Sequence, residues 1–266
     1  MREKRKYIPP VNMSSLPMER GRSIFLGKIA GMESKAFFDI DMLPKHAFIS
    51  GGSGTGKSIT AMVIAEECLS KGICVIVFDT SGNWKEFAAR NNLRYMESQI
   101  SYNHLETDDT MHIENGSMKI LNLSQLTEND YNEFIKNNLS GMIYRSWDTT
   151  DKLGILLIFE DAYKLSPRFG GQAAIMLEKA CREFRKFGIG IMLITHSYSD
   201  FGPAVLGNVN TEIWFKTSQE DDLQRIRKRY GPEYASALVK LRIAECMVAN
   251  VDYNYSKPWF VELKQL

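Results

Sequence analysis

The chain has 266 residues, of which 44% are hydrophobic, and its 33 basic and 32 acidic side chains leave a formal net charge of +1. This length suits one sizeable α/β domain with small appendages, and the balanced charge means that any nucleic-acid contact must be local. The four cysteines stand singly, without C-x-x-C spacing, so we expect buried thiols in a reducing compartment. No signal peptide and no apolar run long enough to span a bilayer is apparent, so we expect a cytoplasmic protein without a membrane span.

The predicted elements begin with a small β-hairpin. Residues 1–22 open with a run of charged side chains and are predicted to form a flexible arm, followed by a single domain over residues 23–266. Two β-type stretches, 24–28 and 35–40, predict a hairpin ahead of the main sheet. A closing hairpin is predicted at the far end of the chain, from the two stretches within 244–263.

The main sheet is predicted from short apolar runs that alternate with helical stretches. Residues 46–50 lead into a glycine-rich loop, and the helix after that loop is predicted to end at Gly72 with a left-handed cap. Continuous apolar runs are typical of parallel strands covered on both faces. We therefore expect an α/β fold, a mostly parallel sheet flanked by helices. The further strand-like runs are 73–78, 155–159, 191–195 and 212–216.

The stretch 91–151 is less regular and is predicted to be an insertion in the domain. An Asn-Gly pair between two alternating runs predicts a β-hairpin over residues 111–123. A hydroxyl cap at Thr127 predicts the start of an amphipathic helix. Nearer the C-terminus, Ser218 predicts the start of a helix that ends before Pro232.

Residues 51–58 match the phosphate-binding pattern G-x-x-x-x-G-K-[ST] between a predicted strand and a predicted helix. Backbone N–H groups of such a loop surround a phosphate, and the helix N-terminus adds partial positive charge. Lys57 is expected to reach the β- and γ-phosphate oxygens, and Ser58 to ligate Mg²⁺. Because strand and helix flank the loop, an ordinary glycine-rich turn is the weaker interpretation, and we expect ATP and Mg²⁺ to bind. The expected nucleotide-binding residues are Gly51, Gly52, Ser53, Gly54, Thr55, Gly56, Lys57, Ser58 and Ile59.

Two acidic side chains, Glu160 and Asp161, follow the apolar run 155–159. Hydrolysis needs an acid that holds Mg²⁺ and a group that orients the attacking water, and this pair offers both. The alternative is that the two acids only cap the helix that follows. Asp79 ends an earlier strand and is either a further site residue or a turn residue.

These segments, in this order, resemble the HerA–FtsK group of ring-forming, DNA-translocating ATPases, and its HerA-like branch in particular. The resemblance extends over most of residues 23–263. The Arg-Lys-Phe-Gly run before a strand that ends in a polar residue is more specific to that group than the phosphate loop. The matching segments are 43–58, 77–84, 119–126, 159–165, 181–190 and 195–200.

The resemblance implies a RecA-like P-loop fold of the additional-strand class and assigns roles to single residues. Lys57 and Ser58 match the phosphate and magnesium residues. Glu160 matches the magnesium-associated acid and, like Ser58, is expected to be a metal ligand. Asp161 matches the base that orients water. His196 matches the polar sensor beside the γ-phosphate.

Arg182 and Arg185 stand where the family presents an arginine to the nucleotide of the neighbouring subunit in a ring, here predicted to be a homo-hexamer. A guanidinium that arrives from outside can neutralise charge on the transferring phosphoryl group. The alternative is a solvated helical face.

Several positions depart from the family pattern. The family usually has glutamate at the position of Asp161 and frequently has an acid at the position of Asn83. At the position of His196 it commonly has glutamine. The shorter carboxylate of Asp161 is expected either to make hydrolysis slower or to act through a second water molecule. Too few residues precede the phosphate loop for the N-terminal barrel of larger HerA proteins, so the resemblance leaves a nuclease partner open.

We interpret the sequence as an ATP-driven ring motor that moves DNA without sequence preference, in DNA packaging, conjugative transfer or repair. Lys164 and Arg168, in the loop 164–171, are the candidate DNA contacts. For a second basic group over residues 225–229, a solvated face is the preferred interpretation. The alternative functions are a slow nucleotide-dependent switch or assembly protein and, with less support, a small-molecule kinase.

Overall fold

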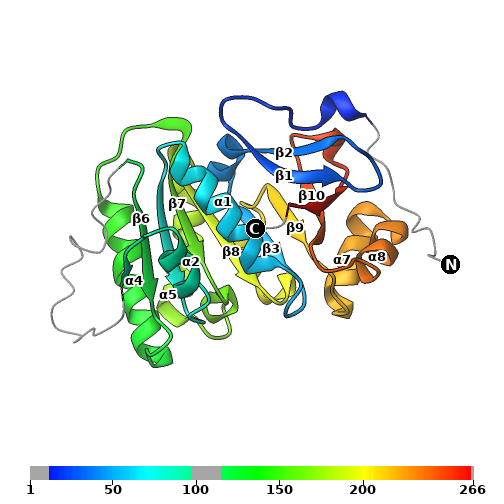
Figure 1. The fold of residues 1–266 in the computed structure, drawn as a ribbon. Helices are drawn as coiled ribbons and strands as arrows, with labels where there is room; N and C mark the ends of the chain where they lie inside the picture. The colour runs from blue at the N-terminus through cyan, green and yellow to red at the C-terminus, as the bar shows by residue number, and fades with distance from the viewer. Residues whose placement is uncertain (1–11, 97–114, 265–266) are drawn as a thin grey trace.

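The computed structural model describes residues 12–96 and 115–264, which form an 11-stranded sheet with helices on both faces (Figure 1). The strands are β1 (Ser23–Ile29), β2 (Lys35–Asp39), β3 (Ala47–Ser50), β4 (Cys74–Asp79), β5 (Tyr95–Met96), β6 (Met118–Asn122), β7 (Thr150–Phe159), β8 (Phe187–Thr195), β9 (Thr211–Trp214), β10 (Glu245–Asn250) and β11 (Trp259–Leu263). The helices are α1 (Lys57–Ser70), α2 (Lys85–Arg90), α4 (Glu128–Tyr144), α5 (Gly171–Glu183), α6 (Pro203–Leu206), α7 (Glu220–Tyr230) and α8 (Pro232–Val239).

The order of the strands defines the class of fold. The sheet runs β2-β1-β11-β10-β9-β3-β8-β7-β4-β6-β5, and the strands from β9 to β5 pair in parallel. Strand β8 lies between β3, which leads into the phosphate loop, and β7, which ends at the two acids. This inserted strand is the feature that the additional-strand class predicts. The expected mostly parallel α/β sheet is confirmed.

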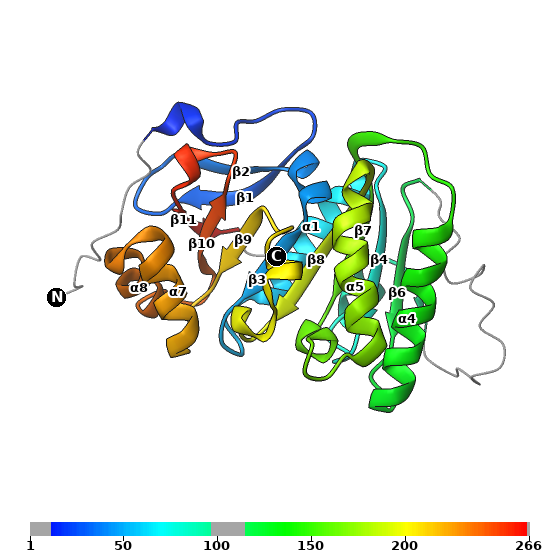
Figure 2. The same ribbon diagram turned by 180° about the vertical axis from the view of Figure 1, so that it is seen from behind.

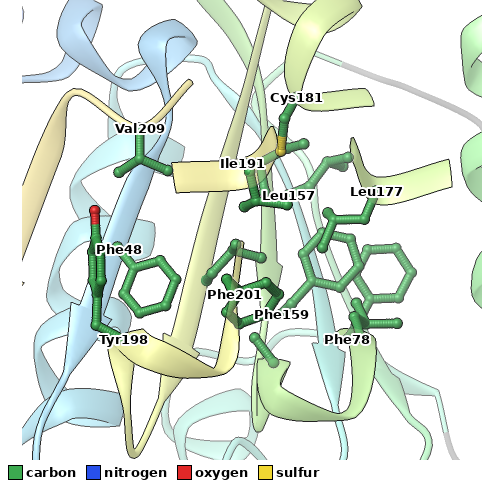
Figure 3. Close-up of a cluster of buried hydrophobic side chains, with 14 of the residues drawn as sticks. Phe48, Phe78, Leu157, Phe159, Leu177, Cys181, Ile191, Tyr198, Phe201 and Val209 are labelled. Carbon is green, nitrogen blue, oxygen red and sulfur yellow. The ribbon is translucent and has the colours of Figure 1, made fainter. Parts of the chain in front are cut away.

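The parallel strands are buried on both faces, as their continuous apolar runs predict. In β4, Ile76 and Phe78 contribute to one hydrophobic core, whereas Val75 and Val77 contribute to the other. Helices α1 and α2 cover the face turned to the viewer in Figure 1, and α4 and α5 cover the opposite face (Figure 2). On the second face the rings of Phe78 and Phe159 stack with centroids 4.4 Å apart (Figure 3). This packing holds β4 and β7 rigidly beneath the residues that follow them.

Both predicted terminal hairpins form, and both extend the main sheet. β1 and β2 pair antiparallel, as do β10 and β11. β11 also pairs with β1, and β10 pairs antiparallel with β9. The two hairpins therefore extend the main sheet at one side instead of packing as separate units. The extension is continuous because β11 pairs with β1 and β10 pairs with β9.

The predicted hairpin over residues 111–123 is not borne out in its second arm. The first arm, 111–114, lies outside the described residues, and the turn at Asn115-Gly116 is present. β6 pairs in parallel with β4 and with β5. Its apolar face is buried by the sheet core, so pairing with the main sheet replaces the local hairpin that the sequence pattern favours.

One predicted helix start is confirmed and one is wrong. Thr127 caps α4, since its side chain accepts a hydrogen bond from the backbone N–H of Asp130. α7 begins at Glu220, and its N-cap residue makes no side-chain capping bond. Ser218 is exposed, and the hydroxyl that accepts the N–H of Gln219 belongs to Thr217.

In the described part of the chain, none of the helices combines the length and the hydropathy that a bilayer crossing requires. Cys68, Cys74, Cys181 and Cys246 are all buried, as expected, and each is present as a thiol. The stretch predicted as an insertion supplies β5, β6 and α4, and Leu16 of the predicted arm is buried. The division into arm, domain and insertion stays a prediction.

Candidate nucleotide-hydrolysis site

The phosphate loop lies between β3 and α1 and requires glycine for a steric reason. Gly51 and Gly56 have φ angles of +150° and +114°. A Cβ atom on Gly51 would lie 2.5 Å from Cβ of Phe215. A Cβ atom on Gly56 would lie 3.2 Å from the aromatic ring of Phe215. Phe215 follows β9 and packs against the loop, so the loop backbone approaches its neighbour too closely for a side chain. The sequence motif did not point to Phe215.

Lys57, the first residue of α1, holds its ammonium group inside the loop. The side chain is 8% exposed, and Nζ donates hydrogen bonds of 2.9 Å to the carbonyls of Gly51 and Gly52. Burial lowers the pKa of Lys57, and the negative charges of Glu160 and Asp161 oppose that shift. A buried cation that spans the loop is suited to bind a phosphate anion, because little water competes for its charge.

Glu160 lies buried at the end of β7 beside the first turn of α1. Its Oε1 accepts a 3.1 Å hydrogen bond from the indole N–H of Trp84, and its carboxylate also pairs with the Ser58 hydroxyl. Burial raises the pKa of Glu160, and the bonds from Ser58 and Trp84 oppose that rise. The Ser58 hydroxyl and the Glu160 carboxylate thus bring two oxygen ligands together, the donor type that Mg²⁺ prefers.

Asp161 takes a different orientation from its neighbour because its backbone is left-handed, with φ 44° and ψ 45°. Its Oδ2 accepts a 3.0 Å hydrogen bond from the Thr80 hydroxyl. Thr80 is buried and follows β4, so two neighbouring strand ends hold this carboxylate. An aspartate adopts this conformation more readily than most residues, yet it remains uncommon outside glycine. Thr80 and Trp84 lie in the segment 77–84 that carries the family resemblance, but sequence reasoning assigned neither of them a role at the site.

Asp79 is a turn residue at the end of β4. Its carboxylate accepts hydrogen bonds from the backbone N–H groups of Ser81, Gly82 and Trp84 and from the hydroxyl of Tyr95. Asp79 is fully buried. Of the two roles considered for it, the structural one agrees with these contacts, and the turn it holds places Trp84 against Glu160.

His196 directly follows β8 and is exposed. Ser50 pairs with Thr195, and Phe159 pairs with Leu193, so the ends of β3, β8 and β7 lie at one edge of the sheet. This edge, the nucleotide edge, carries the phosphate loop, the acid pair and His196. The structure therefore brings together the residues predicted for phosphate, metal, base and sensor roles.

Arg182 and Arg185 lie at the opposite edge. Both are exposed and precede β8, whose nine residues span roughly 30 Å at about 3.3 Å each. Arg182 pairs with Glu178 at 3.6 Å. Among the described residues, no carboxylate forms an ion pair with Arg185. Neither arginine can therefore approach the phosphate loop of its own chain.

The two predicted DNA contacts differ in their surroundings. The Lys164 ammonium lies 5.9 Å from the centroid of the buried Tyr131 ring, and Lys164 is half-buried. Arg168 is exposed and stacks 5.1 Å from the centroid of Phe169, which is itself 39% exposed. Arg168 is therefore the more accessible of the pair.

The residues at the nucleotide edge fit a nucleoside triphosphate with Mg²⁺. Across residues 12–96 and 115–264, no group of three His, Cys, Asp or Glu side chains is arranged to hold a metal alone. A cation at Ser58 and Glu160 would thus need oxygens from a bound phosphate, which is how Mg²⁺ commonly binds in phosphoryl-transfer sites. The fold and this site define a P-loop ATPase of the additional-strand class.

Comparison with known families agrees with this class. The profile of the family DUF87, described as "Helicase HerA, central domain", matches residues 24–171, more than half of the chain. The chain belongs to this family, as the sequence resemblance predicts.

A curated relative extends this finding over a shorter stretch. The "Probable DNA double-strand break repair helicase HerA" of Methanocaldococcus jannaschii is 33% identical over 98 residues. The match covers 35% of this chain and 20% of that protein. The chain thus corresponds to only about a fifth of the relative.

Solved structures share the fold at low sequence identity. VirB4 of Thermoanaerobacter pseudethanolicus has a TM-score of 0.70 at 13% identity, covering 94% of this chain and 98% of its own. The genome packaging NTPase B204 of Sulfolobus turreted icosahedral virus 2, in complex with AMPPCP, has a TM-score of 0.53 at 16% identity, covering 83% and 97%. The cytoplasmic domain of the type VII secretion ATPase EccC of Thermomonospora curvata has a TM-score of 0.66 at 13% identity, covering 97% and 30%.

Proposed function

We propose that this protein is an ATP-hydrolysing motor that works as a hexameric ring and moves DNA without sequence preference. The observation that carries the proposal is the separation of its charged groups. The phosphate loop and the acid pair lie at the nucleotide edge, whereas Arg185 lies at the opposite edge without a carboxylate partner among the described residues. Such a site is complete only where two chains meet.

Binding of ATP with Mg²⁺ would supply an activated phosphoryl group and a metal that neutralises its charge. Lys57 exchanges its bonds to the two loop carbonyls for contact with phosphate oxygens. Ser58 and Glu160 offer their oxygens to the metal. Because Trp84 holds Glu160 through Oε1 and burial restricts water, the carboxylate is oriented before the nucleotide arrives.

Asp161 is the proposed base. Its carboxylate accepts a bond from Thr80 and retains further acceptor sites for the proton of an attacking water. His196 follows the strand between the loop and the acids, and it is proposed to contact the γ-phosphate. A contact that forms only when the terminal phosphate is present would report hydrolysis to the rest of the protein.

Arg185 is proposed to act on the nucleotide of the adjacent subunit. Together with Arg182, Lys186 and Lys45 it lines a groove of about 600 Å³ at its own edge of the sheet. Asp41 and Asp151 also line this groove, so its four basic side chains exceed its two acidic ones, and the net positive charge suits the phosphates that a neighbouring chain presents. Since Arg182 already pairs with Glu178, Arg185 is the stronger candidate.

DNA is proposed to contact the loop that follows the acid pair. Arg168 and Phe169 are exposed there, and a guanidinium can bind a backbone phosphate of any sequence. Three of the basic residues over 225–229 are occupied within the protein. Arg225 bonds Tyr198, Arg229 pairs with Glu212 and Arg227 pairs with Glu220. That group is therefore left out of the proposed DNA surface.

A slow nucleotide switch is the second candidate, and one observation favours it. The carboxylate of Asp161 is one methylene shorter than glutamate and already accepts a bond from Thr80. A base held back in this way would slow the reaction without preventing nucleotide binding. A switch of this kind would bind ATP and change its state of assembly, but it would not move along DNA.

Measurement of ATP turnover with and without double-stranded DNA separates the two candidates. DNA should raise the turnover of a motor several-fold, whereas unchanged turnover would favour the switch. Lys57→Ala should lower turnover at least a hundredfold, since a lost transition-state charge contact costs about 3 kcal/mol. Lys71→Ala, at the other end of α1, is the matched control. Turnover that persists in a folded Lys57→Ala variant would exclude this site.

A further inference from the structure

The loop that carries His196 is fixed to helix α7 by one buried carboxylate. Asp222, in the first turn of α7, is fully buried. Its Oδ1 accepts hydrogen bonds from the backbone N–H groups of Tyr198 and Ser199, both 3.1 Å, and from the Ser197 hydroxyl at 3.2 Å. Each of the three residues after His196 thus donates to the same side chain.

A second set of contacts fixes the same loop further along α7. The hydroxyl of Tyr198 donates to Glu212 Oε1 at 2.8 Å. Arg225, one turn beyond Asp222, donates to that hydroxyl at 3.2 Å and lies 4.3 Å from the ring centroid. Arg229 pairs with Glu212. Tyr198 therefore contacts α7 at two successive turns, through Asp222 and through Arg225.

Tyr198 also connects the loop to the strand that leads into the phosphate loop. Its ring lies beside Phe48 of β3, with centroids 4.5 Å apart (Figure 3). Trp214, at the end of β9, stacks on Tyr198 with centroids 4.9 Å apart. A buried ring packed on both sides cannot shift alone, because close-packed cores move by discrete rearrangements of whole groups.

We propose that Asp222 is a positioning residue that holds His196 in place for the reaction, and that α7 moves with the nucleotide state through this contact. The inference rests on the proposed ATPase function and adds a residue that touches neither nucleotide nor metal. When His196 meets a terminal phosphate, the turn 197–199 shifts with it, and the carboxylate conveys that shift to α7. The consequence is a path from the nucleotide edge to the α7–α8 pair within one subunit.

A double-mutant cycle with His196 tests the positioning role. Asp222→Ala should lower kcat for ATP about thirtyfold and leave KM within about threefold, because Lys57 and the loop still bind the nucleotide. In a His196→Ala background the same change should have less than a threefold further effect, since Asp222 acts through His196. A full thirtyfold loss in both backgrounds would overturn the proposal, as would unchanged kcat in Asp222→Ala.

Matched variants separate position from general stability. Asp221 is the exposed neighbour in the same turn, so Asp221→Ala should leave kcat and KM unchanged. Asp222→Asn keeps the side-chain volume and one oxygen acceptor and should restore kcat to within about threefold of the unmodified protein. If Asp222→Asn is as impaired as Asp222→Ala, the charge rather than the loop position is responsible, and the proposal fails.

Hydrogen exchange on the unmodified protein provides a test that does not depend on folding of a variant. Amides of residues 197–200 and of the first turn of α7 should become protected together when a non-hydrolysable ATP analogue and Mg²⁺ bind. Protection of the phosphate loop without any change in α7 would overturn the coupling. Absence of nucleotide binding and of turnover in the unmodified protein would instead reject the proposed ATPase function.

Discussion

Glu160 and Asp161 are adjacent in the sequence, but their carboxylates meet different partners. Glu160 is buried between Ser58 and Trp84, whereas Asp161 turns to Thr80 from a left-handed backbone. Two acids at one strand end can hold distinct roles only if their environments differ in this way. The backbone conformation of Asp161 produces the difference.

Amide variants of the two acids should therefore behave differently. Glu160→Gln removes a charge beside Ser58, so we expect loss of the Mg²⁺ dependence of nucleotide binding. Asp161→Asn should bind ATP with Mg²⁺ nearly as well as the unmodified protein and lose at least a hundredfold in turnover. Titration with a fluorescent ATP analogue, with and without Mg²⁺, measures the first property, and phosphate release measures the second. Equal binding and equal rates in the two variants would contradict these roles.

The sequence predicted most of the candidate site because the chemistry of phosphate binding constrains consecutive residues. The phosphate loop and the acid pair are each formed by residues that are consecutive in the sequence. Thr80, Trp84 and Phe215 were not predicted, since each contacts the site through a strand distant in the chain. Asp79 remained open for the same reason: its hydrogen bonds depend on how the turn 80–84 folds back.

At the scale of secondary structure, buried polar residues connect elements that lie apart in the sequence. His46, just before β3, has a φ of 59° and is buried. Its Nδ1 accepts a hydrogen bond from the N–H of Ile191 in β8 at 3.1 Å, so Nε2 carries the proton and donates to the carbonyl of Cys181 at 2.9 Å. The strand that leads to the phosphate loop is thereby joined to α5, which contains Arg182 and ends shortly before Arg185.

His46 should make the protein less stable as the pH falls. Burial lowers its pKa from 6.5 to about 4, an effect that the charge of Arg185 reinforces and the bond to Cys181 opposes. Above pH 6.5 the ring is neutral in both folded and unfolded states. Between pH 6.5 and about 4 only the unfolded chain binds the proton, so stability declines by about 2 kcal/mol between pH 6.5 and 5.

Denaturant unfolding at pH 7 and pH 5 measures this effect against a variant. His46→Asn keeps an acceptor for Ile191, tolerates the positive φ and does not titrate, so it should be less stable at pH 7 but depend less on pH. Other carboxylates and histidines contribute equally to both proteins and cancel in the comparison. An identical pH dependence in the two proteins would show that His46 is not the responsible group.

Prediction of elements succeeded where burial and local pattern agree and failed where tertiary pairing decides. β3, β4, β7, β8 and β9 each contain most of an apolar run that predicts a strand, although β7 and β8 begin several residues earlier than predicted and β9 ends at Trp214. The Asn115-Gly116 turn favours a hairpin, but β6 joins β4 in parallel because its apolar side chains are buried there. Local turn chemistry cannot specify which distant strand is the partner.

At the scale of the whole molecule, the sheet separates two functional edges. The phosphate loop, the acid pair and His196 lie at one edge, and the groove lined by Arg182 and Arg185 lies at the other. In a ring with head-to-tail contacts, the second edge of one subunit faces the first edge of the next. In the proposed ring, each hydrolysis event would therefore act directly on the interface between neighbours.

A mixture of two inactive variants should therefore regain activity. Arg185→Ala retains an intact phosphate loop, and Lys57→Ala retains an intact arginine, so some mixed interfaces combine both. For equal mixing in a ring, about a quarter of the interfaces join the two intact parts, and we expect a comparable fraction of the unmodified turnover.

The control is Arg182→Ala. Because Arg182 is already paired with Glu178, this variant should lose less activity when tested alone. Subunit exchange is verified with two fluorescent labels. Absence of recovery under exchange, with a monomeric mass in ATP and DNA, would reject the ring and favour the switch, whose site is complete within one chain.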